Sequence, residues 1–260
     1  MKFEEKLKQS RAEDIWNEYC GFLDLNIDEY MNIQNRLMEE QLSLWTGSQL
    51  GKKLLKGKSI HSVKELRESF PLTTYEDYAD VLLQKRGDML PAEPIIWIQT
   101  TWEGGKHPIK VAPYTEGMLN TYKNNILACM ILCTSTEKMR FSAKAGDTML
   151  YGLAPLPYAT GLMPRALCDE ITVEFLPPVE EAEKLSFSER NKKGFKMGMS
   201  RGIDFFSDWE VSRTMSADPF HKWLPARAEK TERVLYSMFL PKGWPDICVQ
   251  NGSAKKKAEI

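Results

Sequence analysis

The 260-residue chain has few of the side chains that most often bind metal ions or form disulfides. It contains three histidines, too few for a histidine-rich metal centre. Its five cysteines are odd in number and scattered, which argues against a disulfide framework. Cys129 and Cys133 would share one helix face, but they lie in the apolar stretch 126–133, where free cysteine packs as a small hydrophobic side chain. We therefore expect no metal site.

The sequence also lacks a long hydrophobic run and an excess of either charge. No apolar stretch approaches the roughly 20 residues needed to span a bilayer, and the N-terminus is too charged for a secretion signal. Lys and Arg number 35 against 36 for Asp and Glu, so there is no sign of a nucleic-acid-binding or polybasic membrane surface. We expect a cytoplasmic protein that binds neither nucleic acid nor membrane.

Helical patterns dominate residues 1–90, which we expect to form a helical cover on the rest of the chain. Asn26 with Glu29, and Thr73 with Glu76, have the spacing of a capping box, in which the side chains at both positions bond to backbone N–H groups. The second box predicts a helix over about 74–85.

From residue 94 onward, short β-rich runs alternate with helical patterns. Thr115 is expected to cap a helix that runs to about 134, and Ser186 with Glu189 forms another capping box. The stretch 155–164 is rich in Pro and Gly and is expected to be irregular. Strands are expected over 95–100, 109–115, 147–154, 171–178 and 203–206.

This alternation predicts an α/β fold with a mostly parallel sheet flanked by helices. The predicted organisation is an N-terminal helical region (1–90), an α/β core (91–242) and a loose polar tail (243–260).

The segment 99–110, QTTWEGGKHPIK, contains the parts of an anion-binding loop between two strands. Glycines let backbone N–H groups turn toward one point, lysine adds positive charge and threonine adds hydroxyl donors. The segment does not match the P-loop pattern of nucleoside triphosphatases, and a glycine hairpin turn explains the same composition. His107 is either a phosphate ligand or base, or an exposed turn residue, and Lys110 is either a second phosphate contact or a solvated strand-end lysine. The candidate phosphate-binding residues are Thr100, Thr101, Gly104, Gly105, Lys106 and Lys110.

The order of several motifs resembles the adenylate-forming superfamily of acyl-activating enzymes. The phenylacetate–CoA ligase-like enzymes and the acyl-acid amido synthetases of the auxin-conjugating type are the most similar branches. Their helix start P-x-T-x-E-D is similar to Pro71, Thr73, Glu76 and Asp77, with one additional residue between Thr73 and Glu76. Their loop S-S-G-T-T-x-G-K is matched in part by Thr100, Thr101, Gly105 and Lys106. Further similarity lies in "PYT" at 113–115 and in the stretches 151–164, 202–206 and 239–242.

The resemblance implies that a carboxylic acid attacks the α-phosphate of Mg-ATP, and that CoA or an amine then takes the acyl group. The glycine loop would hold the β- and γ-phosphates, and Lys110 would match the family's lysine just after the loop. The stretch 151–164 resembles the region near the acyl pocket, so the implied acid-binding residues are Tyr158, Thr160 and Gly161.

Two departures from the family pattern leave a second interpretation open. The family's central Gly-Thr-Thr is Trp102-Glu103-Gly104 here, which places a carboxylate where phosphate is expected. Family members also continue well beyond the position of Lys242, so the chain is expected to be the N-terminal portion of such an enzyme, inactive alone. The alternative is a non-catalytic interaction module, or one subunit of a split enzyme whose partner chain supplies the missing half.

Overall fold

The computed structural model describes residues 1–70, 72–100, 107, 109–201 and 205–207. They form a mixed α/β structure in which helices dominate and the sheets are small. The chain divides into two compact units, one with residues 1–20, 123–156 and 160 onward, the other with residues 21–122 and 157–159. One boundary between the units falls inside the helix α7 (Glu116–Cys133), which no sequence signal marks. The predicted division at residues 90 and 242 stays a prediction.

The unit of residues 21–122 and 157–159 consists of short helices, one long helix and one pair of strands. Its helical core packs Leu42, Leu55 and Ile60 together, with Trp45 and Phe70 edge-to-face at 5.0 Å beside them. Its elements are η1 (Gly21–Asp24), α3 (Ile27–Gly47), α4 (Gln49–Leu55), α5 (Val63–Ser69), η2 (Tyr75–Asp77), α6 (Ala79–Leu83), η3 (Gly87–Met89), β1 (Ile96–Gln99) and β2 (Val111–Tyr114).

Capping boxes begin two segments of this unit, one as predicted and one a residue later. Asn26 accepts hydrogen bonds from the N–H groups of Asp28 and Glu29, both at 3.0 Å, and starts α3 as predicted. The predicted box of Thr73 with Glu76 is wrong: the Thr74 N–H donates to the Asp77 carboxylate at 2.7 Å. The expected helix over 74–85 is therefore split into η2 and α6, and Glu76 is left outside the cap.

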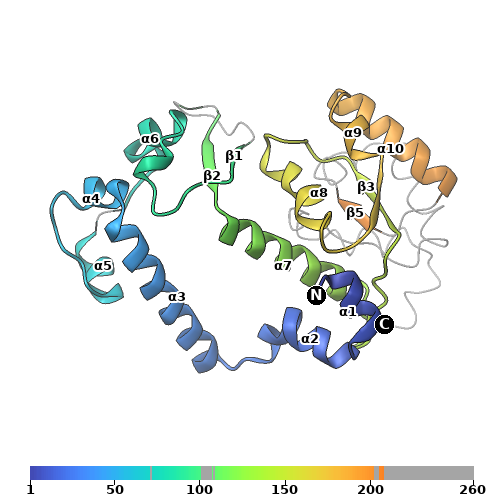
Figure 1. Cartoon of the computed structure of the whole chain (residues 1–260), viewed down its shortest axis with the longest axis horizontal. Coiled ribbons are helices and arrows are strands. Elements are labelled where there is room, and N and C mark those ends of the chain that lie inside the picture. The colour runs from blue at the N-terminus through green and yellow to red at the C-terminus, as the bar shows by residue number, and fades with distance from the viewer. Residues whose placement is uncertain (71, 101–106, 108, 202–204, 208–260) are drawn as a thin grey trace, which may run out of the picture. The chain divides into compact units, whose positions relative to one another are not determined.

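Strands β1 and β2 form an antiparallel pair in which Ile96 lies opposite Tyr114 and Gln99 opposite Val111 (Figure 1). The expectation of a mostly parallel sheet is thus wrong for these two strands. The physical reason is the connection, since a parallel pair needs a crossover of a dozen or more residues, usually a helix, whereas an antiparallel pair can be joined directly. β2 then runs into α7, where the Met118 N–H donates to the predicted cap Thr115 at 3.3 Å.

The other unit contains a three-stranded parallel sheet in the order β4-β3-β5, so the parallel arrangement is confirmed for these strands. Helices lie between the strands in the sequence, as the alternating pattern predicts. Its elements are α1 (Phe3–Gln9), α2 (Ala12–Cys20), the later part of α7, β3 (Asp147–Tyr151), η4 (Ala159–Gly161), α8 (Leu162–Leu167), β4 (Val173–Leu176), α9 (Val179–Ala182), α10 (Phe187–Arg201) and β5 (Phe205–Ser207).

The centre of this unit is apolar and well covered. Fully buried side chains come from β3, β4, α7 and α8, among them Leu150, Leu176, Met130 and Leu167. Gly194 lets α10 lie against the sheet, because a Cβ there would be 2.8 Å from the carbonyl oxygen of Leu176. The core therefore places α7, α8 and α10 around the parallel strands.

The stretch 155–164 is more regular than its composition predicts. η4 covers residues 159–161 and α8 begins at Leu162, with Pro164 in its first turn. Proline is tolerated there because the first N–H groups of a helix have no partner within the helix. Among the described helices, none combines the length and the hydropathy that crossing a bilayer requires.

Candidate functional site

The glycine segment connects the two strands of the antiparallel pair. The Thr100 N–H donates to the carbonyl oxygen of Lys110 at 2.9 Å, so the two ends of the connection are fixed to each other. Thr101, Gly104, Gly105 and Lys106 lie outside the described residues. Of the predicted phosphate contacts, the structure thus brings together Thr100 and Lys110, both partly buried, at the base of a hairpin.

The side chain of Tyr75 contacts the strand that follows the glycine segment. Its hydroxyl donates to the carbonyl oxygen of Val111 at 3.0 Å and accepts from the Val111 N–H at 2.8 Å. Its ring packs edge-to-face against His107 at 5.8 Å, and the Lys110 ammonium lies 5.9 Å from the ring centre. One aromatic side chain from η2 therefore touches three residues after the glycines.

Glu76 and His107 make a second connection between the same segments. His107 Nε2 lies 3.2 Å from the Glu76 carboxylate, and the His107 side chain is 22% exposed. His107 is thus a partly buried, paired residue, and the alternative of an exposed turn histidine is wrong. The pair is possible because the cap of η2 uses Asp77, so that Glu76 faces the hairpin.

A third segment reaches the hairpin from the opposite side. The Gln99 N–H donates to the carbonyl oxygen of Pro157 at 2.6 Å, and Gln99 forms a parallel β-bridge with Tyr158. Of the predicted acid-binding residues, Tyr158 therefore lies beside Gln99, the last residue of β1, which directly precedes Thr100. Burial raises the pKa of Tyr114, at the far end of β2.

Thr160 and Gly161 have local structural roles. The Thr160 hydroxyl donates to the carbonyl oxygen of Ala154 at 2.9 Å. A Cβ on Gly161 would lie 2.2 Å from the backbone nitrogen of Leu156, so the chain folds back tightly at this position. Both contacts stabilise the loop that follows β3, and their predicted part in binding an acid stays a prediction.

The charged groups at the hairpin base are the Lys110 ammonium, the Glu76 carboxylate and the His107 imidazole. The Lys110 ammonium at the end of the hairpin can attract an anionic ligand. The Glu76 carboxylate, which would repel such a ligand, is paired with His107. No group of three or more His, Cys, Asp or Glu side chains that could hold a metal ion occurs in the described part of the chain. We therefore assign no residue to a metal.

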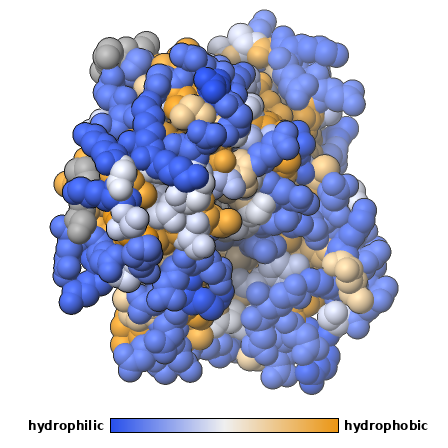
Figure 2. All heavy atoms as spheres, turned by 60° about the vertical axis from the view of Figure 1, so that its left-hand side comes forward, coloured by the Kyte–Doolittle hydropathy of each residue, from blue (hydrophilic) through white to orange (hydrophobic). Residues whose placement is uncertain are grey.

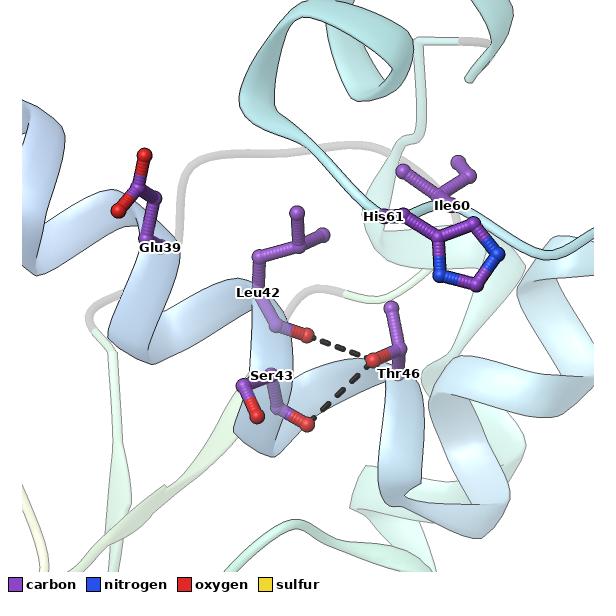
Figure 3. A pocket seen from close by; sticks show the side chains of 6 residues that line it. All are labelled: Glu39, Leu42, Ser43, Thr46, Ile60 and His61. Atoms are coloured by element: carbon purple, nitrogen blue, oxygen red, sulfur yellow. Dashed lines mark hydrogen bonds between the residues drawn. The ribbon is translucent and has the colours of Figure 1, made fainter.

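A pocket of about 220 Å³ lies elsewhere in the same unit, between α3 and the segment before α5 (Figure 3). The Thr46 hydroxyl in this pocket already donates to the Leu42 carbonyl at 2.8 Å, and Leu42 and Ile60 belong to the helical core. None of the predicted site residues lines it, so we do not assign it to the candidate site. Its lining residues are Glu39, Leu42, Ser43, Thr46, Ile60 and His61.

Sequence reasoning missed Tyr75 and the pairing of Glu76. Both residues lie in the stretch 71–77, which reads locally as a helix start. Their partners are 36 and 31 residues away in the chain. No local pattern encodes a contact at that separation, so only the motif order, in which this stretch precedes the loop, gave any signal.

No family model, curated protein or solved structure matches the chain.

Proposed function

We propose that the chain carries the phosphate-binding part of an enzyme that activates a carboxylic acid with ATP. In this proposal the segment 99–110 holds the β- and γ-phosphates, and the acid forms an acyl-adenylate that CoA or an amine then consumes. The proposal rests on the resemblance to the adenylate-forming superfamily.

The observation that carries the proposal is the meeting of three separate segments at one hairpin. Residues 75–76, 99–111 and 157–158 each belong to a stretch that resembles the family, and hydrogen bonds join them around β1 and β2. A chance likeness of short motifs gives no reason for these three stretches to be neighbours. Their proximity supports a shared site.

Each segment has a distinct task in this proposal. Thr100 and Lys110 fix the ends of the loop, and the Lys106 and Lys110 side chains supply positive charge to the phosphates. Tyr158, beside β1, borders the acid, while Thr160 and Gly161 keep its loop folded. ATP supplies the adenylyl group that makes the acid reactive, pyrophosphate leaves, and AMP is released when CoA or the amine takes the acyl group. The chain binds and orients the ATP.

Calorimetric titration with Mg-ATP tests this proposal. Lys106→Ala is expected to weaken binding about tenfold, since a charge-assisted hydrogen bond to phosphate at the lower end of the usual range is worth roughly 1.5 kcal/mol. Lys58→Ala, which removes an exposed lysine from the same unit, is the matched control and is expected to bind like the unmodified chain. Equal affinity of all three proteins, or absence of any binding, would argue against a phosphate loop.

A second candidate function, an interaction module, is favoured by the surface of α3. Seven apolar side chains along one side of this helix are between 36% (Ile33) and 70% (Ile27) exposed. Figure 2, which turns the left-hand side of Figure 1 forward, shows hydrophobic surface among the hydrophilic side chains. Exposed apolar side chains that gather on one side of a helix are a candidate contact surface. The residues are Ile27, Tyr30, Met31, Ile33, Leu37, Met38 and Leu44.

If the α3 face is a contact site between copies of this chain, the chain will dimerise with increasing concentration. Leu37→Lys is expected to shift the dimerisation constant at least tenfold toward monomer, because it places a charge in an apolar contact. Asn32→Lys adds the same charge to an exposed position on the polar side of α3 and serves as the control. Sedimentation equilibrium measures both variants, and a monomer at every concentration would rule out self-association through α3.

A further inference from the structure

We infer that Tyr75 is a positioning residue that fixes the outgoing strand of the glycine hairpin; this inference rests on the proposed phosphate-binding function. In an antiparallel pair, opposed residues alternate between those that bond to each other and those whose N–H and C=O groups point outward. Because Thr100 bonds to Lys110, the opposed pair Gln99 and Val111 is of the outward kind.

The outward groups on the two strands are satisfied in different ways. On β1, the Gln99 N–H bonds to the backbone of Pro157. On β2, both outward groups of Val111 bond to the single hydroxyl of Tyr75, which acts as donor and acceptor at once. A tyrosine side chain thus takes the place of a neighbouring strand at the residue where the hairpin closes.

The Tyr75 ring is itself held in place. Tyr78 packs edge-to-face on it at 5.7 Å and His107 at 5.8 Å, while the Lys110 ammonium lies over its face. The ring therefore contacts one residue inside the glycine connection and one at its end. Through these contacts η2 restrains the positions of Lys110 and of the Val111 backbone, which follow the glycines.

Tyr75 thus acts on the proposed phosphate site indirectly, by holding the backbone of Val111. With the hydroxyl present, Val111 and Lys110 are held at fixed positions relative to Thr100. Without it, two backbone groups at the hairpin base have no partner on that side, and the outgoing strand can shift. A loop that binds an anion through many backbone groups then loses affinity, because its ends are no longer fixed.

Tyr75→Phe, compared with Tyr78→Phe, tests this role. The first variant removes the hydroxyl that bonds to Val111, and the second removes a hydroxyl from the adjacent ring without touching those bonds. Amide hydrogen exchange at Val111 is expected to speed up about tenfold or more in Tyr75→Phe only, as for loss of a buried hydrogen bond. Calorimetry is expected to show about three- to tenfold weaker Mg-ATP binding in the same variant.

The outcomes separate this inference from the proposed function. Unchanged exchange at Val111 in Tyr75→Phe overturns the inference, and so does an equal acceleration of all amides, which indicates general destabilisation. Unchanged Mg-ATP affinity despite faster exchange at Val111 overturns it as well, because the strand would then move without effect on the site. If the unmodified chain binds no Mg-ATP, the proposed function fails, and the exchange at Val111 alone decides whether Tyr75 fixes the strand.

Discussion

Gly161→Ala is expected to lower the free energy of unfolding by about 1–3 kcal/mol, the usual range for overpacking a well-filled site. The added Cβ would lie 2.2 Å from the Leu156 nitrogen and 2.4 Å from the Pro155 carbonyl carbon. Both are backbone atoms, so the clash cannot be relieved by rotating a side chain. The loop after β3 has to move instead, and urea denaturation followed by circular dichroism measures the loss.

Gly117→Ala is the matched control for this substitution. Gly117 lies in the first turns of α7, and the closest atom to an added Cβ there is 3.9 Å away. Alanine at this position is expected to stabilise the chain slightly, by up to about 1 kcal/mol, because glycine is a poor helix former. If Gly161→Ala proves as stable as the unmodified chain, the tight turn is not a structural requirement, and a binding role becomes the better account of Gly161.

The local parts of the fold were predictable because they depend on residues three or four apart. The capping boxes of Asn26 with Glu29 and of Ser186 with Glu189 are both confirmed. The box near residue 74 was misplaced by one residue. The repeats Thr73-Thr74 and Glu76-Asp77 allow two boxes with the same spacing, and the sequence contains nothing local that selects between them.

Strand pairing was less predictable, since it depends on contacts between distant segments. The parallel order of β3, β4 and β5 follows from the helices between them. The antiparallel pairing of β1 with β2 follows from a connection too short for a crossover, a signal that was present in the sequence but outweighed by the general alternation.

The candidate site was predicted only in part, because some of its contacts join residues that are distant in the sequence. Thr100 was identified because composition marks a glycine-rich connection and Lys110 because of the family resemblance, and they do lie at the two ends of the connection. Tyr75 and Glu76 were read as a helix start because that is what their neighbours encode. Their contacts with Val111 and His107 depend on where η2 packs, which no spacing rule describes.

The largest expected change in ligand affinity comes from the carboxylate inside the loop. The family pattern has threonine where this chain has Glu103, and a negative side chain close to a triphosphate opposes binding. Glu103→Thr is therefore expected to tighten Mg-ATP binding about five- to thirtyfold at low salt, equivalent to roughly 1–2 kcal/mol of removed repulsion. The gain is expected to shrink as salt is added, because screening weakens the repulsion in the unmodified chain.

Glu93→Thr is the control that separates this local effect from a change in net charge. Glu93 is exposed and precedes β1, at the end of the strand away from the glycine segment. The substitution Glu93→Thr removes the same charge from the same unit. It is expected to change Mg-ATP affinity less than twofold, because a surface charge away from the ligand is screened. Calorimetry at two salt concentrations compares the variants. Equal affinities of Glu103→Thr and Glu93→Thr would mean that the 103 side chain is remote from any bound phosphate, and the segment would then be a hairpin turn with a glycine-rich composition.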